Sequence, residues 1–346
     1  MNIEKKATIY DVANACEVSA ATVSRVLSSS TYPVKAATKE KILQVAKQLN
    51  YTPNLLGKAL KTRQVRDIGV IVPNISNSHY SLLLQGVYDK VIEEGYTPIL
   101  LNSYRNPEIE EKNIELLMRK QTRGIIIVSI SSNTAAIKNA ISHGCQVVMI
   151  EQDTDVDCLK IGFNFRKGAY LAAQHLIENG HKKIGFIGAP LDRPSRVQML
   201  EGYKQSLIDA NLPVIDKFIH LNSQEIDGAS IYEFENGMAA AKGFCDKSDR
   251  PTGYMCINDM TALGAMKAFT QHGLKIPEDV SVIGFDNIPY AKIAIPELTT
   301  IDQCAYEMGI LSSRMLIEHI EDVTKPNVSV VLEPTLVVRH SVGRVC

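Results

Sequence analysis

From Asp67 onwards, short apolar segments alternate with segments of helical periodicity, and this alternation restricts the possible folds more than any other feature. Apolar runs that predict strands lie at 68–73, 97–103, 124–130, 146–151, 183–188, 217–221, 253–258 and 280–285. Predicted helices separate them at 78–94, 107–120, 133–143, 166–179, 195–210, 229–247 and 259–272. Short apolar strands joined by helices are typical of βαβ units, whose strands form parallel sheets. Four of these strands precede residue 160 and four follow it, so we expect an α/β fold with two similar doubly wound lobes.

Residues 8–50 have a different pattern, which predicts a helix-turn-helix. Thr8 is a suitable N-cap, and Asp11 can complete a capping box with it. Ser19 is a suitable cap for a second helix, after a turn of about three residues. The helices are expected at 9–16, 20–27 and 37–49. Because the second helix of such a motif reads bases in the major groove, the pattern indicates a DNA-binding module.

The charge of the chain is distributed unevenly, although its net charge is only −1. Residues 1–66 contain eleven Lys or Arg and four Asp or Glu, a balance of +7, and the remaining residues have a balance of −8. A basic module attached to an acidic body is typical of a protein that binds nucleic acid through one small part. A solvated basic tail would have the same charge, but tails lack the helical periodicity found here.

Features that the sequence lacks disfavour several functional classes. It has no run of about 18 apolar residues, which a membrane-spanning helix needs, and its first residues, MNIEKKATIYDVANAC, do not resemble a secretory signal. The seven cysteines are scattered and form no CxxC pair, so we expect reduced thiols, a cytoplasmic location and no zinc site. No GxGxxG follows the first predicted strand, and no catalytic cluster is recognisable by spacing, so we expect neither an enzyme nor a cofactor.

Sequence blocks along nearly the whole chain resemble the lactose-repressor (LacI/GalR) family of bacterial transcriptional regulators. They are ATIYDVANACEVSAATVSRVLS, LNYTPNLLGKAL, IGVIVPNISN, HLIENGHKKIGFIG, INDMTALGAMKAF, VIGFDN and PELTTI, in this order. The resemblance implies a helix-turn-helix headpiece on a two-lobed, periplasmic-binding-protein-like core. It implies a DNA-binding domain at 1–52, a hinge helix and linker at 53–66 and an effector-binding core at 67–346. The lobes of the core are expected at 67–162 with 292–322, and at 163–291 with 323–346.

The resemblance assigns DNA recognition to the second helix and to the hinge. Ala20, Ala21 and Arg25 occupy base-reading positions, and Arg25 suits a guanine, to which an arginine can donate two hydrogen bonds. Hydroxyl and amide side chains suited to phosphate contacts are Thr8, Tyr10, Ser19, Thr22, Ser24, Thr38 and Asn54. Leu60 matches the leucine that the family inserts into the minor groove, and Lys58 stands where the family often has arginine.

The resemblance also places an effector cleft between the lobes, where ligands of open α/β sheets bind beyond the carboxyl ends of the strands. The positions that match the family's ligand contacts are His79, Tyr80, Glu151, Arg193, Ser195, Tyr232, Asp259 and Asp286. Asp259 is also expected to cap the helix that follows it. His79 has a second interpretation, as a solvated residue at a helix N-terminus.

Two positions near this cleft depart from the family pattern. Sugar-binding members have an arginine where this chain has Met199, and Arg196, one helical turn earlier, is the expected substitute. Phe165 replaces a common asparagine and is expected to pack at the crossover between the lobes rather than to face the cleft. Arg193 and Ser195 match positions that the purine-repressor branch uses, so the effector class stays open between a carbohydrate and a purine.

Two alternative functions share this architecture. Catabolite-control regulators of the family bind a phosphoprotein corepressor, but their partner-binding region has an arginine where this chain has Ile295. Solute-binding transport proteins have a similar core, but they are exported and lack a headpiece such as residues 1–61. The chain ends RHSVGRVC, without the heptads that join some members of the family into tetramers. We therefore expect a homodimeric transcriptional repressor that binds a palindromic double-stranded operator and a small, sugar-like effector.

Overall fold

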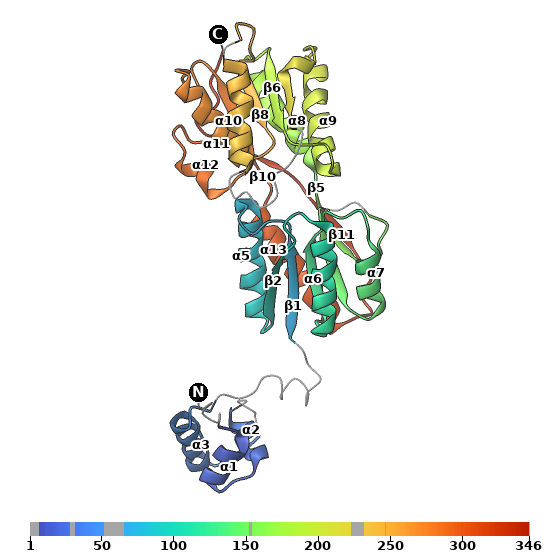
Figure 1. Cartoon of the computed structure of the whole chain (residues 1–346), viewed down its shortest axis with the longest axis vertical. Helices are drawn as coiled ribbons and strands as arrows, with labels where there is room; N and C mark the ends of the chain where they lie inside the picture. The colour runs from blue at the N-terminus through green and yellow to red at the C-terminus, as the bar shows by residue number, and fades with distance from the viewer. Residues whose placement is uncertain are drawn as a thin grey trace. The chain divides into compact units, whose positions relative to one another are not determined.

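The computed structural model describes residues 7–27, 32–51, 66–151, 154–222, 232–245 and 247–345. The chain divides into two compact units, Met1–Val65 and Arg66–Cys346 (Figure 1). No helix within the described ranges is long and apolar enough to cross a lipid bilayer. The first unit is the helical headpiece and the second is the α/β core, so the expected combination of folds is confirmed.

The described part of the headpiece consists of α1 (Ile9–Cys16), α2 (Ala20–Leu27) and α3 (Ala36–Gln48). These limits agree with the predicted ones to within one residue. One apolar residue from each helix, Val12, Val23 and Ile42, is fully buried, and the three belong to one small core. The apolar positions that repeat at helical spacing therefore face one another, as expected for a helix-turn-helix.

Both predicted helix caps of the headpiece are confirmed. Asp11 Oδ2 accepts a hydrogen bond from the Thr8 backbone N–H at 2.7 Å, and Thr8 Oγ1 accepts one from the Asp11 N–H at 3.4 Å. Ser19 Oγ accepts from the Thr22 N–H at 3.1 Å at the start of α2. Between the two helices, Glu17 has a left-handed backbone with φ 59° and turns the chain from α1 into α2.

The first lobe of the core is a parallel sheet with the strand order β11-β5-β4-β3-β1-β2. Its strands are β1 (Asp67–Val72), β2 (Thr97–Asn102), β3 (Gly124–Val128), β4 (Gln146–Ile150), β5 (Leu159–Phe163) and β11 (Ser329–Leu332). One face packs against α5 (Ser78–Glu93) and α13 (Ala305–Glu321), and the other packs against α6 (Pro107–Arg119) and α7 (Ala135–Ser142). Ile126 and Ile127 of β3 point to opposite faces and are both fully buried. A sheet covered on both sides explains why its strands are continuous apolar runs.

The second lobe repeats this arrangement with the strand order β12-β10-β9-β8-β6-β7. Its strands are β6 (Ile184–Gly188), β7 (Ile219–Leu221), β8 (Gly253–Cys256), β9 (Ser281–Asp286), β10 (Thr299–Asp302) and β12 (Thr335–Val337). The helices on one face are α8 (Phe165–Glu178) and α9 (Pro194–Asp209), and those on the other are α10 (Tyr232–Cys245) and α11 (Asp259–Gln271). The short helices α12 (Pro289–Ile293) and η1 (Asp216–Phe218) lie in connections. Among the described strands of this sheet, β10 and β12 pair antiparallel and the others pair parallel.

The chain passes between the lobes after β5, after β10 and after β11 (Figure 1). These three strands and β12 do not appear among the strands predicted from the sequence. Because these strands were not predicted, the limits of the two lobes also differ from the expected ones. β10 lies within 292–322 but pairs with β9 of the second lobe, and β11 lies within 323–346 but pairs with β5 of the first. These four strands mix polar with apolar residues (LKIGF, TTID, SVVL and TLV) instead of forming the continuous apolar run that predicts a buried strand, and no change of composition marks the crossings.

Helices α5 and α13 pack so closely that glycines are required where they touch. A Cβ atom on Gly86 of α5 would lie 2.1 Å from the backbone oxygen of Tyr306, and one on Gly309 of α13 would lie 2.1 Å from that of Leu83. Neither contact is sterically allowed, so a larger residue would force the two helices apart. This packing fixes α13 against the first lobe directly after the chain has crossed from β10.

Gly86→Ala is expected to lower the free energy of unfolding by about 1–3 kcal/mol, the usual cost of overpacking a tight contact. Urea unfolding followed by circular dichroism measures this change. The matched control is Gly243→Ala in α10, because no atom lies within 4 Å of the added Cβ there. Alanine should stabilise that helix by about 0.5–1 kcal/mol. Effects of the same sign and size at both positions would contradict the steric argument.

Asp259 is a fully buried crosslink of the second lobe, and it is not the helix cap that was expected. Asn258 caps α11 instead, since its Oδ1 accepts from the Thr261 N–H at 2.8 Å. The Asp259 carboxylate accepts from the Ile288 N–H at 2.8 Å and from the Thr300 hydroxyl at 2.5 Å. It thereby joins α11 to β10 and to the segment that follows β9. Burial raises the pKa of this carboxyl to about 7.

The raised pKa of Asp259 predicts a pH-dependent contribution to stability. A carboxyl with a higher pKa in the folded than in the unfolded chain stabilises the fold at low pH, and this contribution is lost as the pH rises from about 4 to about 7. Asp259→Asn keeps the shape, and its amide can accept from the Ile288 N–H and donate to the Thr300 hydroxyl. The variant should therefore lose less unfolding free energy than the parent between about pH 5 and about pH 7.5 in urea titrations. Parallel stability curves would contradict this assignment.

Candidate functional site

A cavity lies between the two lobes of the core, at the carboxyl ends of their strands. It is lined by eight of the nine residues expected to contact an effector, which are His79, Tyr80, Glu151, Arg193, Ser195, Arg196, Tyr232 and Asp286. The ninth, Asp259, is not among the lining residues, because its carboxylate is committed to the crosslink described above. The topological rule for open α/β sheets thus brings the predicted residues together.

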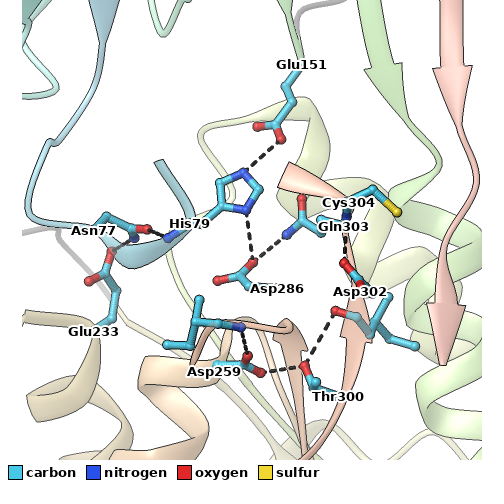
Figure 2. A network of polar contacts seen from close by, with 12 residues as sticks. Asn77, His79, Glu151, Glu233, Asp259, Asp286, Thr300, Asp302, Gln303 and Cys304 are labelled. Carbon is cyan, nitrogen blue, oxygen red and sulfur yellow. Dashed lines mark hydrogen bonds and ion pairs between the residues drawn. The ribbon is translucent and has the colours of Figure 1, made fainter. Parts of the chain in front are cut away.

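His79 lines the cavity and is buried, so its alternative interpretation as a solvated residue is excluded. Asn77 caps α5 by accepting from the His79 N–H at 2.9 Å, and this places the imidazole in the cleft. Its side chain is 7% exposed, with Nε2 3.4 Å from Glu151 Oε1 and Nδ1 4.0 Å from Asp286 Oδ1 (Figure 2). Burial opposes a charge on the ring, but the two carboxylates outweigh it and raise the pKa of His79.

Asp286 ends β9 in an unusual backbone conformation and faces His79 from the second lobe. Its φ is 123°, and the next residue, Asn287, has φ 59°, so two consecutive non-glycine residues lie in the left-handed half of φ/ψ space. Such strain is concentrated at functional sites. The Asp286 carboxylate accepts from the Gln303 amide, which lies in the segment after β10 (Figure 2). Burial raises the pKa of Asp286 well above its usual range, although His79 opposes this shift.

A second set of polar residues at the cavity was missed by the sequence analysis. Glu233, at the start of α10, accepts from Arg105 at 2.6 Å and from the Asn77 amide at 3.1 Å. Asn77 and Arg105 belong to the first lobe, so both contacts join the lobes. The carboxyl-end rule could have identified Arg105, which follows β2 and has φ 57°. No sequence signal pairs Glu233 with a residue 128 positions away.

The positions that depart from the family pattern also line this cavity. Arg196, the expected substitute for the missing arginine, donates to the Pro190 carbonyl at 3.1 Å and to Asp192 at 2.7 Å, so it is anchored to the preceding loop. Met199 is 3% exposed and lines the cavity one turn further along α9. The Phe165 ring stacks on that of Phe285 with 6.3 Å between centroids, and it also lines the cavity. Phe165 therefore both packs against a neighbouring aromatic residue and lines the cleft.

The chemistry of the cavity suits a small polar ligand. His79 Nδ1, Gln303 Oε1 and Thr261 Oγ1 are buried and have no hydrogen-bond partner among the described residues. Carboxylates and arginines lie beside aromatic faces, a combination that binds hydroxyl- or amide-bearing rings. Within the part of the chain that the structure describes, no group of three or more His, Cys, Asp or Glu could hold a metal ion.

The expected base-reading residues lie on α2 of the headpiece. Arg25 is exposed, and its guanidinium carbon lies 4.1 Å from the centroid of the Tyr32 ring. This cation–π contact holds the guanidinium at the surface without burying it. Ala21 is exposed and Ala20 is half-buried, so neither offers more than a methyl contact.

The expected phosphate-contacting residues are divided between exposed, half-buried and undescribed positions. Tyr10 is 68% exposed, and Thr8 and Ser19 are exposed while their hydroxyls also cap helices. The half-buried residues of this set are Thr22, Ser24 and Thr38. Three further predicted contacts, Asn54, Lys58 and Leu60, lie outside the described residues.

Comparison with known proteins agrees with both parts of the structure. Residues 8–54 match the family described as "Bacterial regulatory proteins, lacI family", and residues 173–342 match a "Periplasmic binding protein-like domain". The chain is 32% identical over 345 residues to the HTH-type transcriptional repressor PurR of Mannheimia succiniciproducens, with 98% of this chain and 99% of the relative covered. It is 33% identical over 337 residues to the ribose operon repressor of Haemophilus influenzae, with 97% and 98% covered.

The fold also has a solved counterpart that contains both the headpiece and the core. The structure of the lac repressor dimer bound to operator and to the anti-inducer ONPF matches with a TM-score of 0.83, at 26% identity. The match covers 97% of this chain and 99% of that one. Both the likeness in sequence and the likeness in structure therefore extend over nearly the whole chain. The chain belongs to the lacI family of bacterial regulatory proteins.

Proposed function

We propose that this protein is a sequence-specific transcriptional repressor, which acts on DNA in the cytoplasm as a homodimer and is controlled by a small, carbohydrate-like effector. The observation that carries the proposal is the presence in one chain of an exposed reader helix and of a polar cavity between two lobes. Two relatives with which the chain aligns almost completely are named as repressors. A solute-binding protein would need only the cavity between the lobes and not the reader helix.

Recognition of the operator depends mainly on Arg25 and on DNA shape. Arg25 is the reader residue with a hydrogen-bonding side chain, and its exposed guanidinium can donate to guanine O6 and N7. Ala20 and Ala21 can contact only apolar groups such as a thymine methyl. The hydroxyls of the headpiece fix the register on phosphates, and Leu60 acts as a minor-groove wedge at the centre of the site.

A homodimer is consistent with the surface of the core as well as with the palindromic operator. Ile293 and Ile295 are 72% and 96% exposed, and they border an apolar depression formed with Leu263 and Met266 of α11. Exposed apolar patches of this kind mark protein–protein contacts. A second copy on this face would bury the patch and pair the two headpieces on a two-fold symmetric site.

The proposed switch is a change in the angle between the lobes. An effector that contacts His79 from the first lobe and Asp286 from the second changes how far the lobes close. That movement separates or joins the two hinge segments of the dimer, so their pairing in the minor groove is lost or gained. The coupling must be reciprocal, because operator binding has to shift effector affinity by the same factor.

Selection of binding sites from random-sequence duplexes, at a stated salt concentration, tests the function directly. We expect a palindrome of roughly 14–20 base pairs with a flexible pyrimidine–purine step at its centre, since the reader helices of a dimer lie about one helical turn or more apart. The selection is repeated with cytoplasmic metabolites present, so that a requirement for a corepressor is detected. No enriched site in either condition would overturn the proposal.

Arg25→Ala should weaken operator binding by about 1–3 kcal/mol and relax the base preference at the position that Arg25 reads. Fluorescence anisotropy with the selected duplex and with single-base variants measures both effects. Arg119→Ala, an exposed arginine of α6 in the core, is the control and should bind as the parent does. A variant at position 25 that retains full affinity and specificity would show that another residue reads the operator.

The effector class can be determined by thermal unfolding in the presence of pentoses, hexoses, disaccharides and purine bases. A ligand present at 100 times its Kd should add about 2.7 kcal/mol of stability and raise the Tm. Asp286→Asn should abolish this shift, because it replaces a carboxyl group that lines the cavity while keeping the shape of the side chain. An undiminished shift in this variant would place the ligand elsewhere.

A further inference from the structure

Polar contacts between the two lobes form a continuous row across the cavity (Figure 2). At one end, Gln303 of the crossover after β10 donates to Asp286. In the middle, Asp286 faces His79 across the lobes. At the other end, Asn77 and Glu233 meet on the side away from the crossover segments. The crossovers connect the lobes at one side, so the lobes can separate at the opposite side. A contact at that opposite side therefore resists separation of the lobes most effectively.

The contact at this far side consists of Asn77, Arg105 and Glu233, and we call it the lip contact. Arg105 and Glu233 are 2.6 Å apart, and their side chains are only 7% and 11% exposed. Ion pairs at this degree of burial are screened much less than pairs on the surface. Asn77 uses both ends of its amide, since Oδ1 caps α5 and Nδ2 donates to Glu233. The lip contact is thus built into the rigid start of α5.

The geometry of the lip contact requires that the lobes be closed. Asn77 and Arg105 belong to the first lobe and Glu233 to the second, so separation of the lobes breaks both hydrogen bonds at once. The contact forms entirely from side chains of this chain. No part of it needs a bound molecule as a bridge.

We propose that the lip contact holds the two lobes closed when no effector is bound, so that closure is the resting state of this regulator. The regulatory part of this inference rests on the function proposed above, whereas the closure itself does not. An effector that inserts between Arg105 and Glu233 would open the core, and one that bridges only His79 and Asp286 would add to its closure. The direction of the response therefore depends on whether the ligand displaces Glu233.

Hydrogen–deuterium exchange of the full chain without ligand tests the closure. Glu233→Gln should speed exchange about tenfold in peptides that cover 77–83 and 189–199, which line the cavity, because it removes a charge-assisted hydrogen bond. The matched control is Glu235→Gln, an exposed position two residues along the same helix, which should exchange like the parent. Exchange in the Glu233 variant that equals the parent's would overturn the inference.

A double-mutant cycle shows whether Glu233 acts through Arg105. Arg105→Gln and Glu233→Gln should each speed exchange, and the double variant should exchange no faster than the single variants, because either substitution alone already breaks the pair. The double variant also contains no unpaired buried charge, so it provides a folded comparison if a single variant unfolds. Multiplicative effects in the double variant would show that the two residues act separately and would overturn the lip contact.

Operator affinity separates a failure of this inference from a failure of the proposed function. If closure controls DNA binding, Glu233→Gln should change operator affinity by about fivefold or more while Glu235→Gln leaves it unchanged. Faster exchange with unchanged operator affinity would overturn the regulatory part. Absence of any operator would overturn the proposed function, and the exchange result would still decide whether the lip contact closes the core.

Discussion

The parallel pairing of strands is the constraint on which the rest of the core depends. In a parallel sheet all carboxyl ends lie at one edge, and the two sheets of this core turn those edges toward each other. Glu151 follows β4, Asp286 ends β9 and Arg105 follows β2, so residues far apart in the sequence are brought to one cavity. Because helices cover both faces of each sheet, charged side chains are excluded from the faces and gather at this edge.

Gathering charges in a buried cleft has an energetic consequence. Each carboxylate there loses hydration and must be compensated by a partner, and the basic side chains that face Asp286 and Glu233, His79 and Arg105, belong to the opposite lobe. How well these buried charges are compensated therefore depends on how close the two lobes are to each other. A ligand that offers new partners to these groups alters the balance between the lobes without having to strain either sheet.

Much of this structure follows from the sequence because its signals are local. The capping box of Thr8 and Asp11 predicted the first helix, and the apolar runs located β1 to β4 and β6 to β9. The strand-end rule placed His79, Glu151 and Asp286 in the cleft. What could not be predicted depends on contacts between distant residues. The crossover strands mix polar with apolar residues and are recognised only by their pairing with distant strands. Asp259 is bound by Ile288 and Thr300 and does not cap α11, and Glu233 meets Arg105 only because the lobes face each other.

The crossings between the lobes also determine the order in which this chain can fold during its synthesis. The first sheet needs β11 and the helix α13, and the second needs β10 and β12, although all four segments come after residue 298. Met308, Leu316 and Ile320 of α13 are part of the apolar core of the first lobe. Neither lobe can therefore complete its hydrophobic core while its C-terminal segments are still inside the ribosome, so the two lobes reach their native packing together at the end of translation rather than one after the other.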